Sequence, residues 1–281
     1  MKPGRESKTA VLVCMGRALA NGDPVLPMFS DPTAFALLPD DARLRVERAR
    51  SEVPAKGLKK AIERGYLRIQ AKVMAARTLA IDDAIRLAAN PQLVILGAGL
   101  DGRAWRMPEL TEVTVFEVDH PDSQRQKQKR VTALGQVAKD VRFVAVDFAE
   151  DDLDQALAAA GHDPKLPTTW VWEGVVMYLT RSSIEATLAV VERRSAPGSC
   201  LSVVYHSPAL VLRVVGAVVR FLREPLRSAF RPEILRSLLA DYGFEIVRDQ
   251  SVAELGRAIS AELAAGTKRA AHLRIATATR R

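Results

Sequence analysis

The spacing of hydrophobic and polar residues divides the chain into a helical first third and a longer part in which strand-like and helical stretches alternate. Four helices are expected in the first third, at 9–19, 32–38, 41–50 and 66–87. Pro24 and Pro27 interrupt the chain after the first of these helices. Asp31-Pro32 indicates the start of the second, because proline is favoured at the first position of a helix.

From residue 91 onward, short apolar runs are separated by stretches that suit helices. The runs predict strands at 93–96, 113–118, 141–146, 169–172 and 200–205. The expected helices between them lie at 102–107, 123–134, 149–160 and 182–194. This alternation predicts a doubly wound α/β fold, in which helices cover both faces of a parallel sheet. Two further strand-like runs follow at 244–248 and 273–277. Periodicity leaves open whether that pair is parallel or antiparallel, and 252–266 fits a loop or a short helix.

The composition is that of an ordinary globular protein. Hydrophobic residues make up 48 % of the 281 and charged residues 26 %, which is enough apolar material for a large core. With Cys14 and Cys200 as its two cysteines, the chain is neither a disulfide scaffold nor a multi-cysteine zinc module. The apolar stretch 209–222 carries two arginines and is too short to span a membrane. No secretory signal is visible, so we expect a cytoplasmic protein with no membrane partner.

A net charge of +8, from 41 basic and 33 acidic residues, is the one unusual bulk property. Such a charge is compatible with an acidic or nucleic-acid partner. The basic residues are scattered, however, apart from clusters at Arg125–Arg130 and Arg280–Arg281, and aromatic residues make up 5 %. Nucleic acid is therefore not the partner that we expect.

A glycine-rich segment, Gly97–Gly102, follows the first predicted strand and has the spacing G-x-G-x-x-G. Glycines there let the backbone turn sharply and approach a ligand closely. Asp119 ends the next predicted strand, where a carboxylate can accept hydrogen bonds from ribose hydroxyls. Together these features predict a nucleotide-like ligand.

Two more carboxylates, Asp147 and Glu173, end the third and fourth predicted strands. Asp147 could accept from an adenine amino group. S-adenosylmethionine carries an ammonium group that needs an anion, whereas three carboxylates would repel the pyrophosphate of NAD. In addition, four predicted helices precede the strand that leads into the glycine-rich segment, whereas dinucleotide-binding domains often begin with that strand. The pattern favours S-adenosylmethionine, and an NAD-linked oxidoreductase is the alternative that the literal G-x-G-x-x-G supports.

The chain resembles the leucine carboxyl methyltransferase-like family of S-adenosylmethionine-dependent O-methyltransferases. The segments that carry the resemblance are Gln92–Met107 (QLVILGAGLDGRAWRM), Val115–Pro121 (VFEVDHP) and Pro167–Thr180 (PTTWVWEGVVMYLT). Further matches, in the family's order, lie at 7–10, 31–32, 76–82 and in the terminal LRIATATR. The resemblance therefore covers nearly the whole chain.

This resemblance implies the class I methyltransferase fold, a Rossmann-like doubly wound sheet of seven strands with an antiparallel last strand. It implies one domain over 1–281. Its expected parts are a helical N-terminal cap at 1–87, a cofactor-binding core at 88–208, a lid insertion at 209–236 and a C-terminal helix and strand pair at 237–281.

The resemblance also implies residues that hold S-adenosylmethionine and its product S-adenosylhomocysteine. The implied contacts are Gly97 and Gly99 with the methionine portion, Asp119 with the ribose, Asp147 with the adenine, Glu173 with the methionine end, Arg77 and Lys8 with the cofactor carboxylate, and Ala98 and Phe148 beside them. Arginine suits such a role, because its planar guanidinium matches a carboxylate with two hydrogen bonds.

One residue departs from the family pattern. Gly102 stands where the family usually has threonine, and glycine at a helix start costs about 1 kcal/mol relative to alanine. Because Gly102 completes the apparent G-x-G-x-x-G, that fingerprint is interpreted as a coincidence. Arg103 and Arg106, which follow, are expected to pair with carboxylates at the end of the sheet.

The expected reaction is O-methylation of a small molecule without a metal, with a carboxylate as the first candidate acceptor. A carboxylate is ionised at neutral pH and needs no general base, whereas a phenol would benefit from one. Tyr178 is expected near the transferred methyl group, and His206, just beyond the fifth strand, is the candidate base; packing or surface roles are open for both. A protein C-terminal carboxylate, a modified transfer RNA, or cofactor binding without catalysis are the alternatives. The identity of the acceptor and the oligomeric state do not follow from the sequence.

Overall fold

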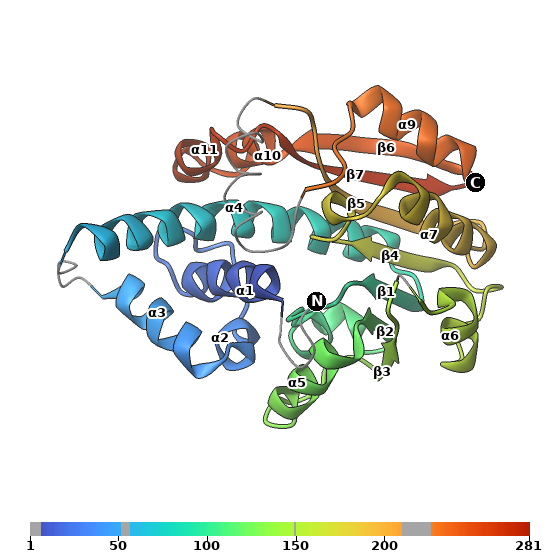
Figure 1. Cartoon of the computed structure of the whole chain (residues 1–281), viewed down its shortest axis with the longest axis horizontal. Coiled ribbons are helices and arrows are strands. Elements are labelled where there is room, and N and C mark those ends of the chain that lie inside the picture. The colour runs from blue at the N-terminus through green and yellow to red at the C-terminus, as the bar shows by residue number, and fades with distance from the viewer. Residues whose placement is uncertain (1–6, 52–56, 149, 210–225) are drawn as a thin grey trace.

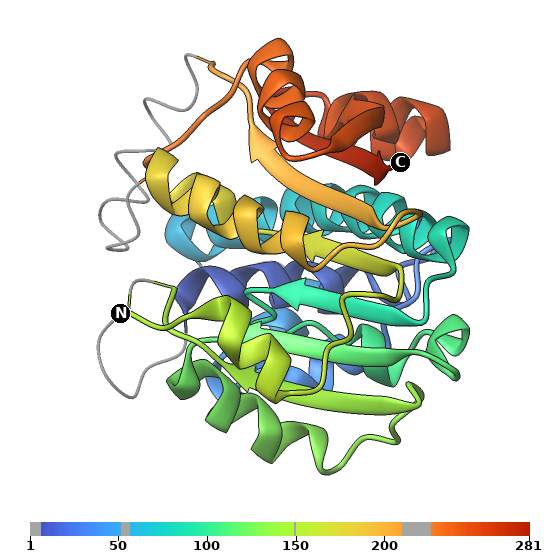
Figure 2. The ribbon, with the colours of Figure 1, turned by 90° about the vertical axis from the view of Figure 1, so that its right-hand side faces the viewer.

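The computed structural model describes residues 7–51, 57–148, 150–209 and 226–281, and its centre is a seven-stranded sheet with helices on both faces (Figures 1 and 2). The strands are β1 (Gln92–Leu96), β2 (Thr114–Asp119), β3 (Asp140–Ala145), β4 (Thr168–Trp172), β5 (Cys200–His206), β6 (Phe244–Ser251) and β7 (Leu273–Arg280). Their order across the sheet is β3-β2-β1-β4-β5-β7-β6. The pairs among β1 to β5 are parallel, and β7 is antiparallel to both β5 and β6. The predicted α/β fold and its antiparallel last strand are confirmed.

The helices α1 to α5, α10 and α11 belong to the core on one face of the sheet, and α6, α7 and α9 cover the other face. The helices are α1 (Lys8–Ala20), α2 (Thr33–Leu37), α3 (Asp40–Arg50), α4 (Leu58–Ala88), α5 (Pro121–Val131), α6 (Leu153–Ala159), α7 (Arg181–Arg193), α9 (Pro232–Asp241), α10 (Val252–Ile259) and α11 (Ala261–Thr267). Strand β1 is buried along its whole length, because Leu93 faces one helical layer and Val94 the other. Its continuous apolar run is the pattern of a strand covered on both sides.

Several predicted helix bounds differ from the structure. The helix predicted at 66–87 begins eight residues earlier, at Leu58. Its first turns lie at the surface, and the first buried residue of the helix is Leu67. The helix predicted at 102–107 is a single 3-10 turn, η1 (Arg103–Trp105), followed by η2 (Pro108–Leu110). The connection 252–266 contains two helices, because the Ser260 side chain caps a second one.

The predicted lid insertion, 209–236, lies largely outside the described residues, which lack 210–225. Its described end includes the start of α9 at Pro232. Before α9, the backbone N–H of Arg227 donates to the carbonyl of Met177 at 2.7 Å, and that of Phe230 donates to the carbonyl of His206 at 2.9 Å. This stretch therefore joins the ends of β4 and β5. Among the described residues, no helix is both long and apolar enough to cross a membrane.

Candidate functional site

The glycine loop after β1 requires glycine at two positions. Gly97 and Gly99 have φ angles of +70° and +48°, a region that glycine enters without strain. A Cβ atom on Gly97 would lie 2.2 Å from Cγ2 of Val175, so a larger residue would displace the segment after β4. The N–H groups of Gly97 and Ala98 donate to the carbonyl of Val118, at 2.8 and 3.0 Å, which fixes the loop against β2.

Asp119 ends β2 beneath this loop, as predicted from the sequence. Its carboxylate accepts hydrogen bonds from the backbone N–H groups of Gly99 and His120. Burial raises the pKa of Asp119, and these two donors oppose the shift. A carboxylate can accept about four hydrogen bonds, so Asp119 retains acceptor capacity for a ligand.

His120 is a residue of the site that the sequence analysis missed. Its Nε2 lies 3.5 Å from Oδ2 of Asp147, and both side chains are about one-third exposed. The side chain also caps α5 by accepting from the N–H of Asp122. In the sequence, the position of His120 directly after the strand-end acid Asp119 and before Pro121 could have indicated that it belongs to the site. The structure thus brings Asp119, His120 and Asp147 together at the ends of β2 and β3, and Phe148 follows directly, packed against the core.

Glu173 ends β4 and lies between two arginines. Its Oε1 is 2.6 Å from Nη2 of Arg77, and its Oε2 is 3.0 Å from Nη1 of Arg103. Burial works to raise the pKa of Glu173, but the two guanidinium charges outweigh it and hold the pKa below its usual value. Glu173 is therefore ionised at neutral pH. The buried Nε of Arg77 has no hydrogen-bond partner among the described residues.

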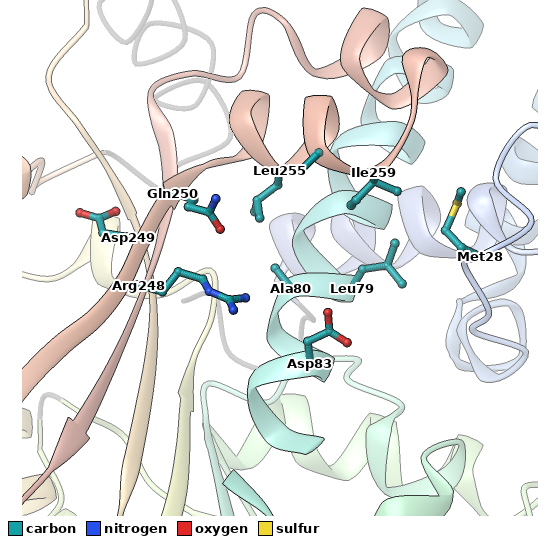
Figure 3. Close-up of a pocket in the computed structure, with 10 residues that line it drawn as sticks. Met28, Leu79, Ala80, Asp83, Arg248, Asp249, Gln250, Leu255 and Ile259 are labelled. Carbon is teal, nitrogen blue, oxygen red and sulfur yellow. The ribbon is translucent and has the colours of Figure 1, made fainter. Parts of the chain in front are cut away.

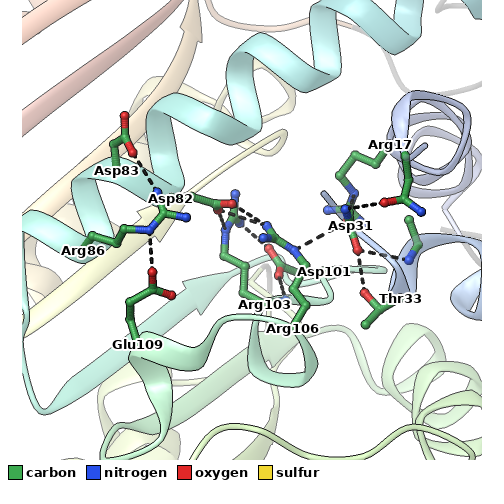
Figure 4. A network of polar contacts seen from close by, with 12 residues as sticks. Arg17, Asp31, Thr33, Asp82, Asp83, Arg86, Asp101, Arg103, Arg106 and Glu109 are labelled. Carbon is green, nitrogen blue, oxygen red and sulfur yellow. Dashed lines mark hydrogen bonds and ion pairs between the residues drawn. The ribbon is translucent and has the colours of Figure 1, made fainter. Parts of the chain in front are cut away.

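Arg77, Arg103 and Glu173 belong to a larger buried charge cluster, most of which is drawn in Figure 4. Arg103 also contacts Asp101 and Asp82, the latter at 2.8 Å. The members of this cluster are four arginines (Arg17, Arg77, Arg103, Arg106) and four acids (Asp31, Asp82, Asp101, Glu173), joined by ion pairs. The cluster links α1 and α4 to the glycine loop and β4. The expected pairing with a carboxylate at the end of the sheet is confirmed for Arg103, which contacts Glu173, whereas Arg106 pairs with Asp31 and with Asp82 of α4.

The structure explains why position 102 is a glycine, which the sequence alone did not. A Cβ atom on Gly102 would lie 1.9 Å from Oγ1 of Thr33, the first residue of α2. That hydroxyl donates to Oδ1 of Asp31 at 2.7 Å. Gly102 therefore leaves room for α2 to pack against the glycine loop. The expected loosening of a helix does not arise, because only a 3-10 turn follows.

Lys8 lies outside the buried charge cluster. It is the exposed first residue of α1 and forms no ion pair with a described residue. The same helix end nevertheless lies over the glycine loop, because a Cβ atom on Gly99 would be 3.1 Å from Cβ of Ala10. The N-terminal N–H groups of a helix favour an anion, so α1 adds to the cationic character of this end of the site.

The ends of β4 and β5 carry Tyr178 and His206. Tyr178 is half-buried in the 3-10 turn η3 (Val176–Tyr178). The His206 ring stacks on His272 with a centroid distance of 5.2 Å, and its buried Nδ1 lacks a hydrogen-bond partner in the described parts of the chain. Burial, followed by His272 and Arg77, lowers the pKa of His206 to about 4. The imidazole is therefore uncharged at neutral pH and is a weak base.

A separate groove of about 700 Å³ lies between α4, β6 and α10 (Figure 3). Leu79, Leu255 and Ile259 are among its apolar lining residues, and Asp83 and Arg248 are among its charged ones. None of the predicted site residues lines it. Within the described residues, no three His, Cys, Asp or Glu side chains are grouped so that they could hold a metal ion.

The strand order, the glycine loop after β1 and the acidic end of β2 define the class I methyltransferase fold. Similar folds occur in a DUF574 family protein from Streptomyces avermitilis (TM-score 0.60, 16 % identity, 96 % of this chain and 97 % of that one). A solved structure from Thermobifida fusca, titled a putative methyltransferase, has a TM-score of 0.60 at 12 % identity and covers 100 % and 97 % of the two chains.

The sequence model of the leucine carboxyl methyltransferase family matches residues 10–192, and the chain belongs to this family. It is 38 % identical over 234 residues to a Mycolicibacterium gilvum protein, covering 78 % of this chain and 72 % of the relative. It is 34 % identical over 202 residues to a Mycobacterium sp. (strain JLS) protein, covering 72 % of this chain and 66 % of that protein, slightly less than two thirds. Both relatives are named "Putative S-adenosyl-L-methionine-dependent methyltransferase".

Proposed function

We propose that this chain is an S-adenosylmethionine-dependent O-methyltransferase that methylates a carboxylate oxygen of a small molecule. Family membership and the names of the relatives support the cofactor and the reaction class. The observation that carries the proposal is the meeting of Glu173 with Arg77 beside the glycine loop, at 2.6 Å. An amino-acid end requires one anion for its ammonium group and one cation for its carboxylate, and this point of the site offers both.

The residues present fit this cofactor. The unpartnered Nε of Arg77 is a buried donor for the cofactor's carboxylate, with Lys8 and the N-terminus of α1 nearby. Glu173 would hold the ammonium group, Asp119 the ribose, and Asp147 with Phe148 and His120 the adenine. Gly97 to Gly99 would keep the backbone close to the methionine portion. When bound, S-adenosylmethionine supplies a methyl group on a positively charged sulfur.

The acceptor side supports a carboxylate. A phenol or alcohol has to lose a proton during methyl transfer, and His206, with a pKa of about 4, would take up that proton poorly. A carboxylate is already ionised at neutral pH, so orientation is the main requirement. We assign Tyr178 and His206 to this side, as groups that position the acceptor oxygen by contact or hydrogen bonding.

Isothermal titration with S-adenosylmethionine, S-adenosylhomocysteine and NADH tests the cofactor first. We expect micromolar binding of the first two and none of NADH, and we expect Asp119→Ala to abolish binding while its circular dichroism spectrum stays unchanged. Binding of NADH alone would contradict the proposal. A panel of carboxylic and phenolic acceptors then tests the acceptor class by release of S-adenosylhomocysteine. Turnover of phenols only would contradict the carboxylate assignment.

The net charge of +8 supports a second candidate, methylation of a modified transfer RNA. Its phosphates would bind basic residues, and the affinity would fall steeply as salt is raised. A filter-binding measurement at ~50 mM salt separates the two candidates. Retention of transfer RNA there would favour the macromolecular acceptor, and its absence would leave the small molecule.

A further inference from the structure

The first three turns of α4 carry an exposed apolar stripe. Its members are Leu58, Ile62, Tyr66 and Ile69, with exposed fractions of 78, 63, 47 and 51 %. At 3.6 residues per turn, these four side chains fall within an arc of about 80° on one side of the helix. Single exposed apolar residues are common, but four on one face of one helix form a patch that is typical of an interaction surface.

The stripe is not part of the core. In the described structure, the first buried residue of α4 is Leu67, which lies on the side of the helix opposite to the stripe and belongs to the hydrophobic core. In Figure 1, these first turns extend past the end of α11. The exposed fractions show that the four side chains are not covered by the described parts of the chain. A protruding convex helix suits a flat or deformable partner better than a preformed pocket.

The charges beside the stripe are basic. Lys59 flanks it on one side and Arg68 on the other, and both are exposed. The guanidinium of Arg68 donates to the carbonyl of Ala49 at 3.3 and 3.4 Å, which leaves its Nη1 for an outside partner. The acid of this segment, Glu63, is paired with Arg45 at 2.6 Å. A second copy of the chain would bring like charges together along the stripe, which opposes self-association. An anionic surface complements the same charges.

We propose that the stripe of α4 lies on the surface of an anionic lipid bilayer. The four apolar side chains would enter the interface between head groups and acyl chains, with the helix parallel to the membrane plane, while the lysine and arginine side chains contact lipid phosphates. Tyr66 suits that depth, because its ring is apolar and its hydroxyl is polar. This differs from the absence of a membrane partner that we expect from the sequence, which concerned a spanning segment and not one lying flat.

Co-sedimentation of the full chain with vesicles tests the proposal without cofactor or acceptor. One vesicle set contains phosphatidylglycerol and phosphatidylcholine in equal parts, and the other contains phosphatidylcholine alone. We expect binding to the first set only. The double variant Ile62→Ser/Ile69→Ser should bind at least about tenfold more weakly, because it removes apolar area and keeps every charge. A matched control, Leu166→Ser/Val247→Ser, removes two exposed apolar side chains elsewhere and should bind like the wild type.

Three outcomes would overturn the proposal. The wild type could stay in solution with anionic vesicles. The Ile62→Ser/Ile69→Ser variant could bind as tightly as the wild type, which would indicate adsorption by net charge alone. Analytical ultracentrifugation could also show a dimer that this variant dissociates, with no vesicle binding, and a second copy would then be what covers the stripe. Both variants change only exposed side chains, and their melting curves check that the fold is intact.

Discussion

The two ends of the candidate site differ in their electrostatics: one contains many buried charges and the other contains uncharged side chains. Around the glycine loop, four arginines and four acids form ion pairs in the interior, so a strongly charged region has no net formal charge. At the ends of β4 and β5, the groups that we propose for the acceptor side are a tyrosine and an uncharged histidine. The difference matches the two partners of the proposed reaction. A zwitterionic cofactor needs fixed charges of both signs, whereas an ionised acceptor needs orientation and no proton transfer.

The largest expected effect is a loss of stability when one arginine of the buried charge cluster is removed. Arg103→Ala leaves Asp82, Asp101 and Glu173 short of a cation in the interior, and removal of one side of a buried ion pair costs about 3–5 kcal/mol. Urea denaturation should show a loss of this size in the free energy of unfolding. Arg181→Ala is the control, because its pair with Glu185 is exposed and contributes about 0–1 kcal/mol. Equal losses in the two variants would contradict the special role of the cluster.

A second change addresses the cofactor end at a residue that also belongs to the buried charge cluster, so its melting curve is compared with that of the wild type. Glu173→Gln keeps the shape of the side chain but removes the anion assigned to the ammonium group, so affinity for S-adenosylmethionine should fall by about 10- to 100-fold, as for loss of a charged hydrogen bond. Isothermal titration measures this. The control is Glu185→Gln, an exposed acid outside the site, which should leave affinity unchanged. If Glu173→Gln binds S-adenosylmethionine as tightly as the wild type, Glu173 is not the residue that holds the ammonium group.

A double-mutant cycle tests whether Gly102 is required for the packing of α2 against the glycine loop. Gly102→Thr places a Cβ atom on Oγ1 of Thr33 and should destabilise the chain by about 1–3 kcal/mol, as overpacking does. Thr33→Gly removes that hydroxyl, and the Gly102→Thr/Thr33→Gly variant should recover part of the loss. Thermal melting of the four proteins gives the coupling between the two positions. Purely additive losses would show that the two residues do not share this space.

The smallest expected effect concerns the uncharged acceptor end. Because the pKa of His206 is lowered to about 4 in the folded chain and stands near 6.5 in the unfolded chain, the unfolded state binds more protons between these values. His206 therefore lowers the stability as the pH falls from about 6.5 toward 4. Urea denaturation at pH 7 and at about pH 5.5 should show that the wild type loses stability on acidification, and that this loss is smaller by about 1 kcal/mol in His206→Phe. Identical losses would indicate that His206 keeps its ordinary pKa.

Local patterns in the sequence determined most of the fold. All seven predicted strands are present. Strand β1 is buried on both faces and contains a continuous apolar run, whereas edge strand β6 mixes buried and exposed residues. The positions of the glycine loop and of the strand-end acids follow from the order of these strands. Helix bounds were less accurate, as at Leu58, where the helix continues along the surface beyond the part that packs on the core. Asp119, Asp147 and Glu173 could be named because the carboxyl ends of parallel strands meet at one edge of the sheet.

Only the tertiary structure decided how these charges are arranged. Nothing local indicates that Arg17 and Asp31 join Arg103 in one cluster, since the partners come from α1, a loop, α4 and the glycine loop. The reason for Gly102 lies in Thr33, which is distant in sequence, and the low pKa of His206 depends on its burial beside His272. Side-chain periodicity reports which positions are covered, whereas ion pairing, steric fit and desolvation depend on which distant segment does the covering.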